Sequence, residues 1–194
     1  MVVSEAPTWS EAGSETFYSM TVALAERGVS TDDLCAFWRA YPFTDDLTQF
    51  GFPGESRHRL YRQYVETFLS FVDDPEASIG FADVVKRPLD EGEDLRDALA
   101  GPYEYGLALR RQLEFVDPAV VVCNKTNVSE VVPALLGEVP PNERVERPTS
   151  LDVTDGDLDT TLVFSAMAHL YMDTFSRSRL VREIERHYQT AQVD

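Results

Sequence analysis

The sequence predicts an α/β protein with three layers, α/β/α, in which helices cover both faces of a short, mostly parallel central sheet. Short β-branched runs such as AVVVC at 119–123 are typical of buried strands, and segments with helical spacing of apolar residues separate them. Strands that alternate with helices favour parallel pairing, because parallel strands need a crossover segment between them. With 194 residues the chain is long enough for a substantial core, and we predict a single domain over 1–194.

The N-terminal part of the chain is predicted to be mainly helical. Its expected elements are a strand at 1–3, helices over 14–27 and 30–41, a loop over 42–54 and a long helix over 55–72. Ser14 is the expected N-cap of the first helix, and Gly28 is its expected stop. In the long helix, apolar residues such as Tyr64 and Phe68 recur at helical spacing, which predicts one buried face.

The rest of the chain alternates between strand and helix. Its expected elements are a strand at 78–85, a helical segment over 93–116, a strand at 119–123, a short helix to 136, a mostly loop stretch over 137–159, a strand at 160–166 and a final helix from about 173. The helical segment is expected to break near Gly101–Pro102, because proline cannot continue a helix. Asn127 can cap the short helix.

The charge balance is strongly acidic. Thirty-four acidic residues face 17 basic ones, which gives a net charge of −17, and Lys86 and Lys125 are the chain's two lysines. Dispersed acidic residues with little lysine are typical of proteins from a high-salt, halophilic cytoplasm, where salt screens the self-repulsion of the surface. The alternative is an acidic interaction protein that works in ordinary salt.

The cysteines and the apolar runs exclude several classes of protein. Cys35 and Cys123 both lie in apolar contexts, which predicts small buried side chains, and no CxxC pair is present to hold zinc or an iron–sulfur cluster. We therefore expect neither a metal nor a cofactor. The apolar runs are too short to cross a bilayer, and no export signal is visible, so a cytoplasmic protein without membrane contacts is expected.

Polar side chains follow the predicted strands at their carboxyl ends, where ligands bind in parallel α/β sheets. The residues at these ends, and at the start of the first helix, are Glu5, Phe17, Tyr18, Asp83, Lys86, Arg87, Asn124, Lys125 and His169. Each has a structural alternative. Glu5 could be a solvated acid, Lys86 and Arg87 could pair with nearby acids, and the two aromatic residues and the histidine could be part of the core.

Four segments together resemble the uracil-DNA glycosylase superfamily. They are SEAPT at 4–8, FADVVKRP at 81–88, DPAVVVCNKT at 117–126 and LVFSAMAHLY at 162–171, and the resemblance extends over about 2–186. ADVVKRP is similar to the T-D/N-x-V-K-R-P stretch of the thymine/uracil mismatch members and, in variant form, of the thermophilic members. SEAPT is similar to the G-E-A-P-G motif of iron–sulfur-containing members, although the cluster-binding cysteines are absent here.

The resemblance implies a role for each candidate residue. Glu5 would stabilise charge and orient water as the bond between base and sugar breaks, and His169 would lie near the carbonyl of the departing base. Phe17, with Tyr18 beside it, would stack on the flipped base. Asp83 would read the hydrogen-bonding edge of the base. Positive charge on Lys86, Arg87 and Lys125 would lie near DNA.

The departures from the family pattern leave two functions open. Ser4 and Thr8 replace glycines of the first motif, and Asp83 stands where many members have Asn. The Pro-Ser that usually follows the family histidine is missing after His169. An ungapped match places Met167, instead of His169, at the position of the family histidine. The first function is a DNA glycosylase-like hydrolase that removes a deaminated or abnormal base. The alternative is an inactive member that binds nucleic acid or a protein. An unrelated acidic α/β protein is a third reading. The target base, the oligomeric state and the completeness of the first strand stay open.

Overall fold

The computed structural model describes residues 1–5, 25–30, 32–33, 59–85, 87, 89–140, 149–156, 158–165 and 174–192. The chain divides into two compact units. One consists of Met1–Pro7 together with Phe81–Asp194, and the other of Thr8–Gly80. The first unit contains the whole sheet.

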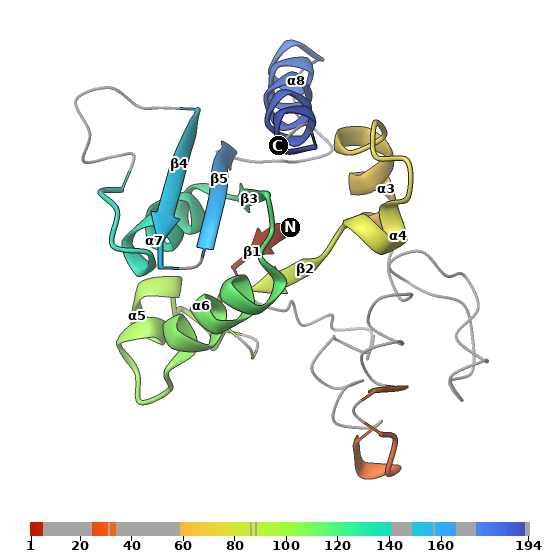
Figure 1. The fold of residues 1–194 in the computed structure, drawn as a ribbon. Helices are drawn as coiled ribbons and strands as arrows, with labels where there is room; N and C mark the ends of the chain where they lie inside the picture. Colours follow the sequence, from red (N-terminus) through yellow and green to blue (C-terminus); the bar gives the residue numbers. More distant parts are fainter. Residues whose placement is uncertain are drawn as a thin grey trace. The chain divides into compact units, whose positions relative to one another are not determined.

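The described residues of the first unit form one five-stranded sheet with the order β2-β1-β3-β5-β4 (Figure 1). The strands are β1 (Val2–Ser4), β2 (Phe81–Asp83), β3 (Val120–Asn124), β4 (Ser150–Asp155) and β5 (Leu158–Ser165). Neighbouring strands pair in parallel from β2 to β5, and β4 is antiparallel to β5. The prediction of an α/β fold with a mostly parallel sheet is therefore confirmed.

One face of the sheet is covered by three helices, α5 (Leu95–Ala100), α6 (Tyr105–Val116) and α7 (Thr126–Leu135). The core on this face contains Val3, Val121, Cys123, Leu162, Leu95, Leu109, Leu113, Val128 and Val132, all at most 1 % exposed. Val121 and Cys123 alternate along β3, and the two residues from α6, like the two from α7, lie four positions apart, about one helical turn. Burial of their side chains is the main force that holds these helices on the sheet.

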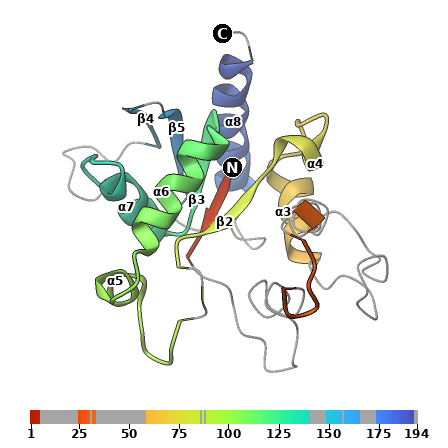
Figure 2. The ribbon, with the colours of Figure 1, turned by 60° about the horizontal axis from the view of Figure 1, so that its bottom comes forward.

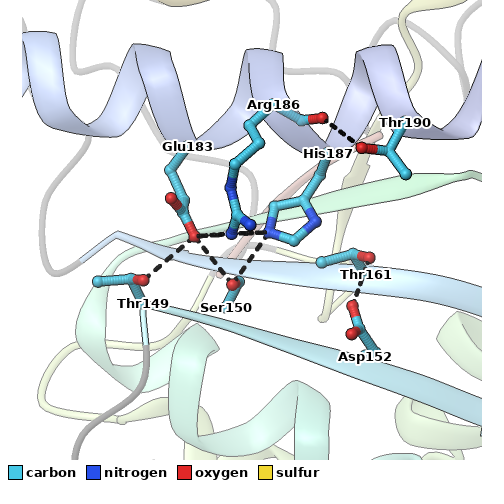
Figure 3. A network of polar contacts seen from close by, with 8 residues as sticks. All are labelled: Thr149, Ser150, Asp152, Thr161, Glu183, Arg186, His187 and Thr190. Carbon is cyan, nitrogen blue, oxygen red and sulfur yellow. Dashed lines mark hydrogen bonds and ion pairs between the residues drawn. The ribbon is translucent and has the colours of Figure 1, made fainter.

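The other face is covered by α8 (Thr174–Ala191), which contacts β3 and β5 and lies across the sheet from α6 and α7 (Figure 2). Its buried residues Leu180 and Ile184 are one helical turn apart. The helix also makes polar contacts with the first residue of β4. Ser150 Oγ donates to Glu183 Oε1 at 2.9 Å and lies 3.0 Å from His187 Nε2 (Figure 3).

Glu183 is the centre of this polar network, which joins α8 to the edge strand β4. The same oxygen also accepts hydrogen bonds from Thr149 Oγ1 at 3.2 Å and from Arg186 Nη2 at 2.7 Å (Figure 3). Partial burial acts to raise the pKa of Glu183, but the hydrogen bonds outweigh burial and lower that pKa to about 2. The carboxylate therefore stays ionised and keeps α8 attached to β4 over the ordinary pH range.

The second unit contains two described helices, α3 (Arg59–Phe68) and α4 (Pro75–Ser78). The long helix predicted over 55–72 is observed over 59–68 and ends four residues earlier than expected, while 55–58 lie outside the described residues. Gly28 has a φ of +75° and its N–H donates to the carbonyl of Ala25, which confirms its expected role as a helix stop. The rest of the helices predicted over 14–27 and 30–41, with Ser14, and the loop over 42–54 lie outside the described residues.

Two predictions about the C-terminal part are wrong. Residues 137–159 were expected to be mostly loop, but 150–155 form the edge strand β4. Its buried Val153 is flanked by exposed Asp152 and Thr154, which is the alternation expected of a strand with one solvent-exposed face. The acidic residues on the exposed face made this segment resemble a loop in the sequence. Asn127 was expected to cap the short helix, but Lys125 is the N-cap of α7.

The predicted break in the helical segment is confirmed, because α5 ends at Ala100 and α6 begins at Tyr105. The strand predicted at 78–85 is shorter, over 81–83, although Val84 and Val85 still donate to the carbonyls of Ser4 and Glu5. Within the described part of the chain, no helix combines the length and the apolar character that crossing a bilayer requires.

Candidate functional site

The order of the strands marks one point of the sheet as a candidate ligand site. From β1 the chain goes to β2 on one side of β1, and it then returns to form β3 on the other side. The connections thus leave β1 and β3 in opposite directions at their carboxyl ends. Such a switch point is where ligands bind in open parallel sheets, because the diverging loops leave space between them.

Glu5 lies directly after β1 at this switch point. Its Oε2 accepts a hydrogen bond from Lys125 Nζ at 3.0 Å, and its Oε1 accepts one from Asn127 Nδ2 at 3.1 Å. Both donors follow β3, the neighbouring strand. The Glu5 side chain is 16 % exposed, so the carboxylate is mostly covered and both of its oxygens are bound. It also lies near the N-terminus of α7, where the helix dipole favours a negative charge.

Lys125 joins β3 to α7 with an unusual backbone conformation. Its φ of 110° and ψ of 157° lie in a region that is essentially restricted to glycine. The turn is held by its N–H, which donates to the Ser165 carbonyl at 3.1 Å, and by its carbonyl, which accepts from Ser129 N at 3.0 Å. Backbone strain of this kind costs about 1–3 kcal/mol and is concentrated at functional sites. The strained turn places the ammonium group on Glu5.

The four parallel strands all end on a polar residue. These residues are Asp83 of β2, Ser4 of β1, Asn124 of β3 and Ser165 of β5. Ser4 pairs with Asp83, and Asn124 pairs with Ser165. Ser4 and Asn124 each lie one residue beyond the pair formed by Val3 and Cys123. Registered residues of parallel strands point to the same face, so the four form one row, which we call the strand-end row.

The structure gives Arg87, a predicted DNA contact, a local partner. Its guanidinium makes two hydrogen bonds to the Glu93 carboxylate, at 2.7 and 2.6 Å. The hydrogen bond from Arg87 lowers the pKa of Glu93 to about 2, and the hydrogen bond with Glu93 raises the pKa of Arg87. This bidentate pair closes the loop after β2 and neutralises the charge of Arg87, so its contact with DNA stays a prediction.

The other predicted site residues divide into two groups. Glu5, Asp83 and Lys125 are described, and all three lie at the carboxyl edge of the sheet, with Asp83 half-buried. Phe17, Tyr18, Lys86 and His169 lie outside the described residues, so their predicted roles stay predictions.

Sequence reasoning gave Asn127 a role as helix cap only, assigned no role to Ser165, and did not predict that the polar strand ends form one row. The signal for the row was present, because each predicted parallel strand is followed or ended by a polar residue. The contact of Asn127 with Glu5 had no such signal, since it depends on the strand order.

In the described ranges, no group of three or more His, Cys, Asp and Glu side chains could hold a metal ion. Cys123 is fully buried, and burial raises the pKa of its thiol to about 12, so this thiol is neither a metal ligand nor a nucleophile in the folded protein. The chemistry of the described site therefore comes from one carboxylate beside one amine and from the strand-end row.

No protein-family model matches the chain, and no curated protein matches it in sequence.

Proposed function

We propose that the protein is a DNA glycosylase-like hydrolase of the base excision repair type, which removes a deaminated or abnormal base. The observation that carries the proposal is Glu5. It is a carboxylate held by Lys125 and Asn127 at the switch point of a parallel sheet, one residue beyond the register of Asp83. The resemblance of four segments to the uracil-DNA glycosylase superfamily supports the same reading of these residues. We further propose that it works in a salt-rich cytoplasm.

The proposed reaction needs a fixed negative charge beside the sugar. When the bond between base and sugar breaks, the base leaves with the bonding electrons and the sugar becomes oxocarbenium-like. A carboxylate at this position stabilises the positive charge and accepts a proton from the water that adds to the sugar carbon. Glu5 supplies this group, and Lys125 supplies a positive charge for a nearby phosphate.

Asp83 bears on the choice of base. An ionised carboxylate accepts hydrogen bonds and cannot donate them, so it favours a base edge that carries N–H groups. Xanthine carries more N–H groups than uracil, which presents carbonyl oxygens on both sides of one N–H. A contact between Asp83 and the additional N–H group of the base would therefore favour xanthine.

Two observations favour a second candidate, an inactive member of the fold that binds nucleic acid or a protein. Both oxygens of Glu5 are already bound by side chains, and the Arg87 charge is neutralised by Glu93. In this case Glu5 stabilises the turn between β3 and α7 and does not meet a substrate.

The two candidates are separated by incubation with single-stranded and duplex oligonucleotides that carry uracil, hypoxanthine or xanthine. The hydrolase produces alkali-labile sites, and Glu5→Gln and His169→Ala remove this activity. Glu91→Gln, a change of an exposed carboxylate in the loop between β2 and α5, retains it. Salt is varied from low to high, because phosphate contacts weaken steeply as salt rises.

Absence of alkali-labile sites with all three bases, together with retained oligonucleotide binding, excludes the hydrolase and favours the binding protein. Cleavage that is equal in the wild type and in Glu5→Gln contradicts the role given to Glu5.

A further inference from the structure

The hydroxyl of Ser165 has no hydrogen-bond partner within the chain that the structure describes, although the residue is 3 % exposed. A buried polar atom without a partner costs about 1–3 kcal/mol, and such atoms are rare in folded proteins. Ser165 ends β5 and is the last member of the strand-end row. Its position suggests that the missing partner comes from a ligand at the carboxyl edge of the sheet.

The face of the sheet on which the row lies can be assigned from the register. Ser150 pairs with Val163, and the Ser150 hydroxyl bonds to α8, so this face of β5 is the one that α8 covers. Ser165 lies two residues after Val163 and therefore points to the same face. Asn124 pairs with Ser165 and shares this face. The row is thus separated from the apolar core under α5, α6 and α7.

The spacing of the row fits a small planar ligand. Adjacent strands lie about 4.8 Å apart, so two neighbouring members of the row can reach two polar groups on one edge of a nucleobase. The chemistry of the row changes along its length, from the acceptor of Asp83 to side chains that both donate and accept on Ser4, Asn124 and Ser165. Asp83 and Ser165 lie three strand spacings apart, about 14 Å, so one base meets two neighbouring members, such as Asn124 and Ser165, and not the whole row.

We propose that Ser165 and Asn124 contact the base directly and that they, and not Asp83 two to three strand spacings away, determine which base the site accepts. The inference rests on the proposed function, because it places the target base of that reaction on the strand-end row. Ser165 donates to a carbonyl oxygen of the base, and the amide of Asn124 bonds to the adjacent group. Burial of the base against Ser165 then satisfies the unpartnered hydroxyl.

Thr160 provides a matched control on the same strand. Its hydroxyl is also buried and without a hydrogen-bond partner in the described chain, at 3 % exposure. Thr160 pairs with Val153, a residue of the core under the three helices, so it points to the opposite face from Ser165. Thr160→Val and Ser165→Ala both remove an unpartnered hydroxyl, and neither variant should be less stable than the wild type without ligand.

The test is equilibrium dialysis of the full chain against free xanthine, hypoxanthine and uracil. We expect at least one of the three bases to bind the wild type, and we expect Thr160→Val to bind that base equally. We expect Ser165→Ala to bind it about five- to tenfold more weakly, since a neutral hydrogen bond contributes about that factor. Asn124→Ala should also weaken binding. Circular dichroism confirms that each variant is folded before its binding is compared.

Two results would overturn the inference: none of the three bases binds the wild type, or Ser165→Ala binds as tightly as Thr160→Val. Base binding that depends on Ser165 without cleavage of oligonucleotides would leave this inference standing and reject the proposed hydrolase. Cleavage of oligonucleotides together with base binding that does not change in Ser165→Ala would support the proposed hydrolase and reject this inference.

Discussion

The ammonium group of Lys125 donates to the carboxylate of Glu5 at 3.0 Å, although the two residues are 120 positions apart in the chain. Each follows a strand of the sheet, and the two strands are neighbours. The contact depends on a turn in which Lys125 adopts a φ of 110°. A charged pair and a strained backbone are therefore combined in one residue, and substitutions can separate their effects.

Lys125→Gly should be more stable than Lys125→Ala, by about 1 kcal/mol or more. Both lose the ion pair, which contributes at most about 1 kcal/mol because the lysine is half exposed. Only glycine relieves the strain of the turn. Urea unfolding measures the difference. At the next residue the order of stability should reverse. Thr126→Ala should be more stable than Thr126→Gly, because alanine is the better helix former. Equal stability of the two Lys125 variants would show that the turn is not strained.

The pair of Arg87 and Glu93 should contribute to stability against acid. The pKa of Glu93 is lowered from 4.5 to about 2 in the folded protein, so the folded state binds this proton less readily than the unfolded state. The contribution is complete above pH 4.5 and is lost as the pH falls towards 2. Glu93→Gln should therefore lower the urea midpoint at neutral pH and have less effect near pH 2. Glu91→Gln is the control, and an equal effect of the two would reject the pair as the cause.

Glu183→Gln should weaken the attachment of α8 to β4. The carboxylate accepts hydrogen bonds from Ser150, Thr149 and Arg186, and bonds to a charged group contribute about 1.5–3 kcal/mol. We expect a loss of that order, measured by thermal unfolding. Glu185→Gln on the same helix changes one contact within α8 and should cost little. Similar losses in both variants would contradict the central position of Glu183.

The thiol of Cys123 should be protected from alkylation as long as the protein is folded. It is fully buried and its pKa is raised to about 12, so almost no thiolate exists at neutral pH. Iodoacetamide labelling, followed by mass mapping of the peptide that contains Cys123, should show modification only when urea unfolds the chain. Rapid labelling without urea would mean that β3 is accessible in the native state.

Added potassium chloride should raise the unfolding temperature. The net charge of −17 produces self-repulsion in the compact state, and the screening length falls from about 10 Å at 0.1 M salt to about 3 Å at 1 M. A midpoint that does not rise between these concentrations would argue for the alternative, an acidic protein adapted to ordinary salt.

The sequence was sufficient to predict the parallel sheet, because runs such as that of β3 are apolar on both faces and have no other stable location. It was not sufficient for β4, whose outward-facing side chains are acidic and make an edge strand resemble a solvated loop. It also could not predict the turn at Lys125, since lysine has no preference for that conformation and tertiary contacts impose it.

The candidate site was predictable as a set of positions, and less so as a set of contacts. Glu5, Asp83 and Lys125 were found because chemistry in parallel sheets is placed at the carboxyl ends of strands. The contact between Glu5 and Lys125 was not predicted, because it depends on which strands are neighbours. Glu93, the partner of Arg87, lies six residues away in a loop with several other acidic residues. The sequence does not indicate which of them pairs with Arg87.

The position of β1 has a consequence for folding. This three-residue strand is synthesised first and lies between β2 and β3, which begin at Phe81 and Val120. One of its edges has no partner until β2 is made, about 80 residues later, and the other has none until β3 is made, about 120 residues later, which takes roughly 6–24 s at ordinary rates of synthesis. The centre of the sheet is thus completed late. A chain interrupted between β2 and β3 would carry the Glu5 carboxylate without Lys125, its partner in the folded protein.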